Sequence, residues 1–436
     1  MSFMPTLIQE CLQGVPSLVS NAAREEGINP RTAARAIARG RMVIPANPVR
    51  AHRICPIGEG CRIKVNVNIG TSGERCDVAL ELEKAAAALG NGADTLMDLS
   101  TGGDLAGIRQ KILEFDVPVG TVPVYEAVRR AGNAADVDAD LLFRVIREHC
   151  RDGVDFLTLH CGVNMQAFEA LKSDPRIMEV VSRGGAFHVA MMATREEENP
   201  LFAEFDYLLE IMAETGVVIS LGDGMRPGCL QDADRHAKTV EYITLGTLSN
   251  RALAAGVQRM IEGPGHIPLD QVGYNVRMLK ELTNDAPLYL LGPIVTDIAP
   301  GYDHVVSAIG SAVACLHGAD FLCMVSPSEH LALPGVPDII EGTRVCRIAS
   351  HIGDIAREKE GYKTPREIQM ARARHSLDWD EQFRIALFGD AARKIHERDG
   401  SVDACSMCGD LCAMKLVSGL FRKQPDRKSE EQDRSP

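Results

Sequence analysis

The sequence lacks any long apolar run. No stretch of its 436 residues approaches the roughly 18 uninterrupted apolar residues that a membrane-spanning helix needs. Residues 1–14 also lack the basic segment followed by an apolar segment that is typical of a secretory leader. We therefore expect a soluble cytoplasmic protein without a membrane partner.

Positive charge is scarce as well. Lys and Arg number 47 against 60 Asp and Glu, which gives a formal net charge of −13. The sequence contains no stripe of basic residues interleaved with aromatic residues, which is the pattern that neutralises a phosphate backbone. The composition therefore argues against a nucleic-acid partner.

Cysteine, in contrast, is plentiful. Ten of the 13 cysteines are scattered singly along the chain, and both the odd count and the length argue against a fully paired disulfide framework. In a reducing compartment such cysteines are mostly small core residues. The remaining three, Cys405, Cys408 and Cys412, lie together near the C-terminus and require a separate explanation.

Short apolar runs alternate with helix-like segments between residues 61 and 334. The first run is RIKVNVNIGTS at 62–72, and the last is ADFLCMVSPSEH at 319–330. Strand–helix alternation over this length predicts an α/β fold of the (β/α)8 barrel type. Nine strand candidates are present, including EVVSRGG at 179–185, and the sequence does not show which one lies outside an eight-stranded barrel.

Three further regions flank the predicted barrel. Residues 1–60 predict a small N-terminal helical cap, in which Asn29 and Pro30 begin a helix and Gly40 follows its end. Residues 335–420 predict a helical C-terminal iron–sulfur domain that contains the three neighbouring cysteines. Residues 421–436 predict a disordered tail, because apolar residues are almost absent there.

The three neighbouring cysteines form a CxxC unit followed by one further thiol, with Gly409 available for a turn. Thiolates at this density are soft ligands that suit an iron–sulfur cluster or zinc. Three cysteines leave one iron of a [4Fe-4S] cube open for a small chelating molecule. A structural zinc ion would need a fourth ligand such as His396, and a redox disulfide is a further alternative. Spacing alone leaves cluster and zinc equally open.

Polar residues beside glycine follow nearly every strand candidate, and the C-terminal strand ends of such barrels carry the active site. His266 in EGPGH and His330 in SPSEH form a pair that can share a divalent metal. SRGG at 182–185 and DGMRPG at 223–228 join arginine to turns that suit phosphate. Each motif alone is explained by a structural role, whereas together they predict a pocket for a small phosphorylated ligand beside a metal.

Ten motifs occur together and in a fixed order: NIGTS, MDLSTGGD, GTVPVY, HCGV, SRGG, LGDGMRPG, EGPGHIP, LGPIVTDIAPGYDH, PSEHL and CSMCGDLC. Through them the chain resembles the phosphomethylpyrimidine synthase family from about residue 20 to 415. The paralogous 5-hydroxybenzimidazole synthase is similar throughout. An ordered set of this size is far more specific than any single motif.

The resemblance implies a radical S-adenosylmethionine lyase. Its [4Fe-4S] cluster would reduce S-adenosylmethionine and generate a 5′-deoxyadenosyl radical. The implied reaction converts 5-aminoimidazole ribotide to 4-amino-5-hydroxymethyl-2-methylpyrimidine phosphate in thiamine biosynthesis. The alternative enzyme takes the same ribotide to the lower base of an anaerobic cobamide (vitamin B12). The resemblance further implies an electron donor such as flavodoxin or ferredoxin, and a homodimer in which each cluster domain covers the partner's barrel.

The resemblance also assigns site residues at the matching positions of this sequence. Cluster ligands would be Cys405, Cys408 and Cys412, and one divalent ion, zinc or iron, would be bound by His266 and His330. The implied substrate contacts are Asn68, Met97, Tyr125, His160, Ser182, Arg183, Gly184, Asp223, Gly224, Met225, Arg226, Glu262 and Tyr289, and Glu262 is also expected to act in catalysis. Local departures such as NVNIGTS for NANIGTS and LCMV for LCYV bear on the product rather than on the cofactor.

Two other classes of function are compatible with the residues. A nonradical barrel enzyme would use His266 and His330 for a catalytic divalent ion and the cysteines for structural zinc. It would be colourless and active without S-adenosylmethionine. A noncatalytic binding module would not need so many ionisable residues at strand ends.

Overall fold

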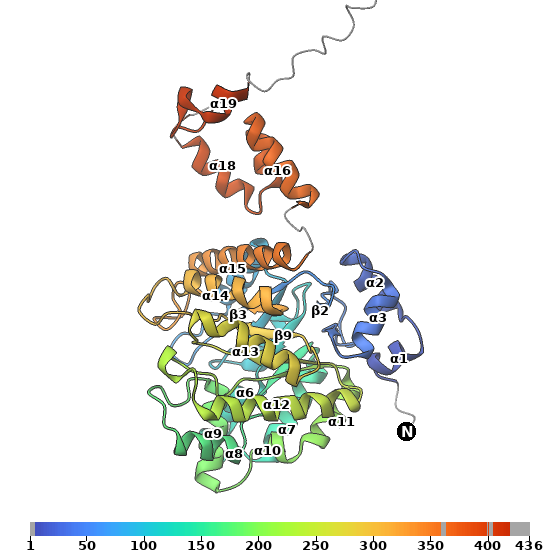
Figure 1. Cartoon of the computed structure of the whole chain (residues 1–436). Helices are drawn as coiled ribbons and strands as arrows, with labels where there is room; N and C mark the ends of the chain where they lie inside the picture. The colour runs from blue at the N-terminus through green and yellow to red at the C-terminus, as the bar shows by residue number, and fades with distance from the viewer. Residues whose placement is uncertain (1–4, 359–362, 399, 401–403, 419–436) are drawn as a thin grey trace, which may run out of the picture. The chain divides into compact units, whose positions relative to one another are not determined.

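The computed structural model describes residues 5–358, 363–398, 400 and 404–418 (Figure 1). The chain divides into two compact units, Met1–Arg357 and Glu358–Pro436. The tail predicted at 421–436 lies outside the described residues. Within the described residues, the search for a helix long and apolar enough to cross a membrane found none.

Eight parallel strands close into a barrel in the first unit. Each strand pairs with the next along the chain, and the last strand closes onto the first. The strands are β3 (Lys64–Ile69), β4 (Thr95–Asp98), β5 (Val119–Thr121), β6 (Phe156–Leu159), β7 (Val218–Leu221), β8 (Arg259–Gly263), β9 (Leu288–Leu291) and β10 (Phe321–Cys323). The predicted (β/α)8 barrel is confirmed.

The strand candidate that lies outside the barrel is EVVSRGG at 179–185. Its Ser182 is the N-cap of α9 (Arg183–Arg195), because the Ser182 hydroxyl accepts a hydrogen bond from the N–H of Gly185. Glu179 has a φ of 51°, which no regular strand contains. A serine cap followed by two glycines begins a helix here, although the two valines suggested a strand.

Helices surround the barrel (Figure 1). The amphipathic segments predicted from the sequence form α4, α7, α10 and α11, and α7 begins at the N-cap Asp138 and ends before Gly153. The helices of this layer are α4 (Val78–Gly90), α5 (Leu105–Ile112), α6 (Pro123–Ala131), α7 (Ala139–Asp152), α8 (Met165–Ser173), α9, α10 (Pro200–Ala203), α11 (Phe205–Thr215), α12 (His236–Ala254), α13 (Leu269–Leu282), α14 (Asp303–His317) and α15 (Val336–Arg357).

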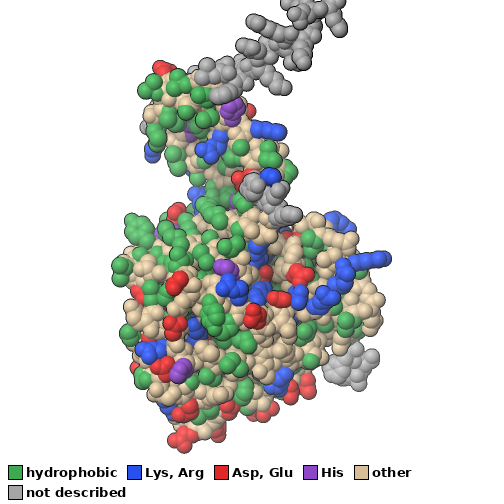
Figure 2. Space-filling view, viewed as in Figure 1, with side chains coloured by type: hydrophobic (Ala, Val, Ile, Leu, Met, Phe, Trp, Pro, Cys, Tyr) green, Lys and Arg blue, Asp and Glu red, His purple; other side chains and the backbone are tan. Residues whose placement is uncertain are grey.

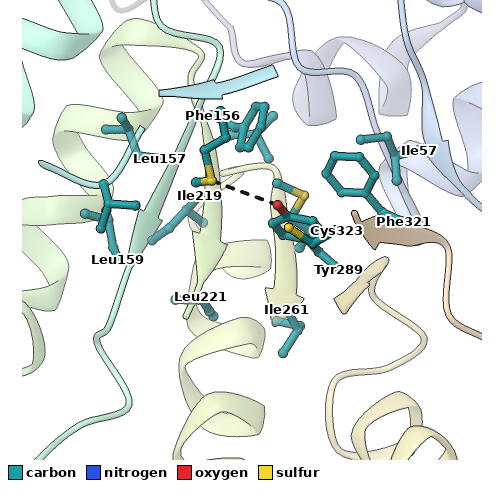
Figure 3. Close-up of a cluster of buried hydrophobic side chains, with 14 of the residues drawn as sticks. Ile57, Phe156, Leu157, Leu159, Ile219, Leu221, Ile261, Tyr289, Phe321 and Cys323 are labelled. Atoms are coloured by element: carbon teal, nitrogen blue, oxygen red, sulfur yellow. Dashed lines mark hydrogen bonds between the residues drawn. The ribbon is translucent and has the colours of Figure 1, made fainter. Parts of the chain in front are cut away.

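The barrel interior is filled by side chains from the strands. The rings of Phe156 and Phe321 lie 6.2 Å apart edge to face, and Tyr289 stacks on Phe321 at 4.3 Å. Figure 3 shows Tyr289, Phe321 and Cys323 close together from neighbouring strands. All three are buried. The interior is therefore a packed core, and a ligand has to bind at its end.

The N-terminal cap is built from α1 (Leu7–Gln13), α2 (Ser17–Glu25) and α3 (Pro30–Ala38), with the short strands β1 (Met42–Val43) and β2 (Ile57–Gly58). Asn29 caps α3 through a hydrogen bond from the N–H of Arg31, and Gly40 follows the helix with a φ of 69°. Positive φ favours glycine, which explains why the sequence pattern located this helix end correctly.

Helix α15 packs on the barrel, although a boundary at residue 335 would assign it to the C-terminal domain. A Cβ added at Gly353 would collide with the side chain of Cys315 on α14, so the two helices are in close contact. The second unit begins after α15. Its helices are α16 (Pro365–Ser376), α17 (Trp379–Ile385), α18 (Gly389–Glu397), the 3-10 turn η4 (Gly409–Leu411) and α19 (Ala413–Ser418).

Candidate functional site

A cavity with about 490 Å³ of empty space opens at the carboxyl ends of the barrel strands. Its lining comes from the strand ends and the loops that follow them. Nine predicted substrate contacts line it: Asn68, Met97, Tyr125, His160, Ser182, Asp223, Arg226, Glu262 and Tyr289. The tertiary structure therefore brings together polar groups that are up to 221 positions apart in the sequence (289 − 68 = 221).

Two buried carboxyl groups lie in this cavity. Glu262 Oε1 accepts hydrogen bonds from the hydroxyls of Thr158 at 2.7 Å and Ser220 at 3.0 Å. Asp223 Oδ1 accepts one from Arg226 Nη1 at 2.9 Å. Burial raises the pKa of both carboxyl groups, that of Asp223 to about 8 in spite of the neighbouring guanidinium. Asp223 can therefore hold a proton near neutral pH, as a group that donates protons must.

His160 follows β6 and lies against two glycine turns. Its Nε2 is 3.2 Å from the Ser182 hydroxyl, and its Nδ1 has no hydrogen-bond partner within the described residues. A Cβ at Gly184 would overlap the imidazole, and a Cβ at Gly222 would come within 2.9 Å of it. Burial holds the pKa of His160 well below its usual value, so the ring is neutral.

The N-terminus of α9 lies at the edge of the same cavity. Ser182 caps the helix and lines the cavity, and the guanidinium of Arg183 lies 5.1 Å from the ring centre of Tyr125. Arg226 lines the cavity from the loop after β7. A helix N-terminus with arginines nearby binds anions such as phosphate. The two motifs interpreted as phosphate turns therefore do lie together.

Amide, phenol and thioether groups line the opposite side. Asn66 Nδ2 donates to Asn68 Oδ1 at 2.8 Å and to the Tyr289 hydroxyl at 2.7 Å. The Tyr289 hydroxyl lies 3.9 Å from Met97 Sδ. These contacts fix the rotamers of Asn68 and Tyr289, which line the cavity.

Gly224 and Met225 contribute backbone rather than side chains. Met225 is fully buried in a separate small apolar cluster with Val163 and Ala167. A Cβ at Gly224 would collide with Val163. These two residues of the predicted set therefore shape the loop between Asp223 and Arg226.

A second, larger cavity, with about 1530 Å³ of empty space, adjoins the first. The two share Asn68, Leu99 and Leu291 as lining residues. Arg183 and His330 line the second cavity, together with Glu329 and the buried Lys84. Two adjoining cavities at one barrel end have room for two ligands that meet at the shared wall.

The two predicted metal-binding histidines lie side by side, with ring centres 5.3 Å apart. His266 Nδ1 is 2.8 Å from Asp297 Oδ1, which leaves Nε2 available, and His330 Nδ1 lies 3.7 Å from Asp303 Oδ1. Burial lowers the pKa of His266, so its ring is neutral. A neutral histidine oriented by a carboxylate is the usual arrangement of a metal ligand, so this pair fits a divalent ion.

The three cysteines of the second unit lie in one tight turn. The N–H groups of Cys408 and Gly409 both donate to the carbonyl of Cys405, and Gly409 adopts a φ of 51°. The N–H of Cys408 lowers the pKa of the Cys405 thiol, which favours the ligating thiolate. All three thiols are free.

No three His, Cys, Asp or Glu side chains converge on a single ion within the described residues. A four-iron cluster places each thiolate on a different iron, so its ligands do not have to meet at one point. The three free thiols from Cys405 to Cys412 are ligands of the kind that such a cluster takes.

Sequence reasoning missed several residues of the site. Thr158 and Ser220 hold Glu262, and Cys323 lines the first cavity beside Tyr289. Their signal was available in principle, because alternate residues of a barrel strand point inward. They lie within strand candidates rather than at the ends, where the search for polar residues was concentrated.

Comparison with known proteins gives one family. A model described as "Radical SAM ThiC family" matches residues 6–419. Phosphomethylpyrimidine synthase from Methanopyrus kandleri is 50% identical over 430 residues, which cover 96% of this chain and 100% of that protein. Phosphomethylpyrimidine synthase 2 from Methanosarcina barkeri is 49% identical over 424 residues, with coverages of 96% and 99%.

Solved structures that resemble the chain are much more distant. Dihydropteroate synthase from Thermus thermophilus shares 14% identity with a TM-score of 0.39, and the match covers 67% of this chain and 93% of that one. This distance is too great to bear on the substrate. The whole-length match to the family model and to relatives of about one-half identity places this chain in the radical SAM ThiC family.

Proposed function

We propose that the chain is a cytoplasmic phosphomethylpyrimidine synthase, a lyase that converts 5-aminoimidazole ribotide to 4-amino-5-hydroxymethyl-2-methylpyrimidine phosphate for thiamine biosynthesis. The observation that carries this proposal is the cavity at the barrel end, which combines an α9 N-terminus, arginine and two buried carboxyl groups whose pKa values are raised by burial. A ribotide needs an anion site and polar partners for its imidazole ring, and this cavity offers both.

Membership of a radical SAM family implies a [4Fe-4S] cluster and S-adenosylmethionine. When bound, the reduced cluster supplies the electron that converts S-adenosylmethionine to methionine and a 5′-deoxyadenosyl radical. Cys405, Cys408 and Cys412 are the proposed cluster ligands, and the electron would come from a donor such as flavodoxin or ferredoxin.

The residues of the first cavity then have distinct proposed roles. Ser182, Arg183 and the N–H group of Gly184 bind the phosphate, because they form the N-terminus of α9. Glu262 holds a proton at Oε2, while Thr158 and Ser220 orient the carboxyl group through Oε1. The remaining predicted contacts position the ring and ribose, and the packed core beneath excludes water from reactive intermediates.

We further propose that His266 and His330 bind one divalent ion, zinc or iron, beside the second cavity. Their ring separation and the carboxylates behind them support this role. In cluster-free protein loaded with zinc, His330→Ala is expected to lose about one zinc per chain. His236→Ala, which removes a histidine remote from the pair, is the control.

A homodimer is proposed as well, and the outer face of α14 and α15 supports it. Six exposed residues of this face are apolar, and Glu341 on α15 is exposed beside them. The six are Tyr302 next to α14, Val305, Ile309 and Leu316 on α14, and Ile348 and Ile352 on α15. The two rows adjoin where Gly353 meets Cys315. Figure 2 shows hydrophobic side chains gathered over this part of the first unit. Each such side chain presents on the order of 100 Å², so six of them approach the roughly 800 Å² per partner of a standard interface.

Anaerobic reconstitution tests the enzymatic proposal. The protein is incubated with 5-aminoimidazole ribotide, S-adenosylmethionine and dithionite, and products are identified by mass spectrometry. We expect the pyrimidine phosphate together with 5′-deoxyadenosine. Cys408→Ser should abolish both, whereas Cys76→Ser, which removes an exposed cysteine of the barrel unit, should not.

Two outcomes would contradict the proposal in different ways. Formation of 5-hydroxybenzimidazole from the same ribotide would assign the chain to the cobamide alternative. Retained 5′-deoxyadenosine formation in Cys408→Ser would remove the radical mechanism, and a nonradical metal-dependent reaction would then have to be considered.

A further inference from the structure

The loop that carries Asp223 and Arg226 is held from outside the cavity at one residue, Met225, through its N–H and its carbonyl. Glu241 on α12 accepts a hydrogen bond from the N–H of Met225 at Oε2, at 2.8 Å. Arg176, in the loop after α8, donates from Nη2 to the carbonyl of Met225, also at 2.8 Å. Neither Glu241 nor Arg176 lines the first cavity. Both are buried.

We propose that Glu241 and Arg176 are positioning residues for ribotide binding. They form a clamp that holds the N–H and the carbonyl of Met225 and thereby fixes Asp223 and Arg226 against the ligand. The inference rests on the proposed function, since it concerns the same cavity. It adds two residues that no sequence motif points to and that do not touch the ligand themselves.

The clamp is rigid on the arginine side. The N–H groups of Ile177 and Met178, which directly follow Arg176, both donate to the carboxylate of Asp232 at 2.9 Å. Nη1 of Arg176 also reaches the carbonyl of Arg226 at 3.5 Å. The backbone beside Arg176 is therefore anchored, and its guanidinium reaches the loop from an anchored position.

On the glutamate side, the clamp leaves no room for a side chain at position 224. Gly224 precedes the held peptide, and a Cβ there would lie 3.3 Å from Glu241 Oε1 in addition to colliding with Val163. Burial raises the pKa of Glu241 well above its usual value, so the carboxyl group is neutral. A neutral amide of the same shape should therefore replace it, because the amide oxygen can still accept from Met225.

The displacement of this loop would act on the ligand directly. Arg226 Nη1 donates a hydrogen bond to Asp223 Oδ1 at 2.9 Å, so the two side chains move together. The carbonyl of Pro227 accepts from the N–H of His266, which ties the far end of the loop to the neighbouring strand end. Met225 lies between these two fixed points. The hydrogen bonds to its N–H and its carbonyl therefore determine the position of the Arg226 guanidinium.

Ribotide binding to the cluster-free protein provides the test, because it does not depend on radical chemistry. Isothermal titration calorimetry with 5-aminoimidazole ribotide gives Kd for the wild type, Glu241→Gln, Glu241→Ala and Arg176→Met. We expect Glu241→Gln to stay within about threefold of the wild type, and the other two to weaken binding at least about tenfold. The double variant Glu241→Ala/Arg176→Met should lose less ribotide affinity than the product of the two single losses, because both residues hold the same residue, Met225.

Gln258→Ala is the matched control. Gln258 also accepts a single backbone N–H, that of Ile44 at 2.8 Å, but it lies at the opposite end of the barrel. It should lower the thermal midpoint by an amount similar to Glu241→Ala and leave Kd unchanged. Equal Kd values for Glu241→Ala and the wild type would overturn the inference, whereas a wild type that binds no ribotide would overturn the proposed function instead.

Discussion

The environment of Asp223 is very different from that of an exposed carboxyl group. It is buried beside Glu262, and Arg226 pairs with only one of its oxygens, since Oδ2 has no hydrogen-bond partner within the described residues. The cost of burying the charge exceeds what one guanidinium returns, so the pKa rises to about 8. A ligand that reaches Asp223 would supply the missing partner.

The raised pKa of Asp223 predicts a pH-dependent stability. The unfolded chain loses this proton near the ordinary value of 3.8, while the folded chain keeps it to about pH 8. The folded state therefore binds more protons across this interval, and its stability falls as the pH rises through it. Asp223→Asn cannot ionise, so its thermal midpoint should decline less than that of the wild type between about pH 6 and about pH 9.

Glu262→Gln provides a comparison for this experiment, since the pKa of Glu262 is also raised by burial but two hydroxyls already stabilise its carboxylate. We expect a smaller change in the slope than for Asp223→Asn. Identical pH slopes for the wild type and Asp223→Asn would show that Asp223 is ionised throughout.

At the scale of elements, α9 has two roles. It covers the barrel with its apolar side, and its first turn supplies the proposed phosphate site. Ser182 serves both roles, because its hydroxyl caps the helix and lies 3.2 Å from His160 Nε2. A substitution of Ser182 should therefore change both the stability of the protein and its affinity for the ribotide.

Ser182→Ala is expected to cost about 1 kcal/mol of stability through the lost cap. Asn29→Ala removes the cap of α3, far from the cavity, and should cost a similar amount. Only Ser182→Ala should weaken ribotide binding, by about tenfold or more, in calorimetric titrations of the cluster-free protein. Equal ribotide affinity in the two variants would mean that α9 contributes to packing alone.

At the scale of the whole molecule, the apolar face of α14 and α15 is conspicuous on a chain with a net charge of −13. Two copies of the chain repel each other because both carry a negative net charge. This repulsion is weakest where a face carries few charged side chains. A two-fold contact needs a patch that is complementary to itself, and one apolar row along a helix satisfies this requirement.

Ile309→Glu is expected to convert the proposed dimer into monomers, because two carboxylates would be buried in the proposed contact. Analytical ultracentrifugation of the full chain measures the change. Ile243→Glu is a matched control, since Ile243 on α12 is 56% exposed and Ile309 is 51% exposed. A dimer that persists in Ile309→Glu would exclude this face as the interface.

Local patterns in the sequence were sufficient for most elements of the fold. Alternating runs predicted the barrel, and Asn29 with Gly40 marked both ends of α3, because caps and turns depend on a few neighbouring residues. The same patterns could not exclude EVVSRGG from the barrel. The choice between a strand and the start of α9 depends on packing beside His160 and the loop after β7, which the segment itself does not encode.

The ordered motifs alone were sufficient to predict the family, because they are spread over most of the chain and unrelated proteins rarely share so many motifs in one order. Only the tertiary structure showed that α15 belongs with the barrel. It also showed that Thr158 and Ser220 orient Glu262. Finally, it showed that Glu241 and Arg176 both hold Met225. These contacts join residues from different strands and helices. Short-range preferences decide helices and strands, whereas closure of the barrel decides which distant side chains meet and how deeply each is buried.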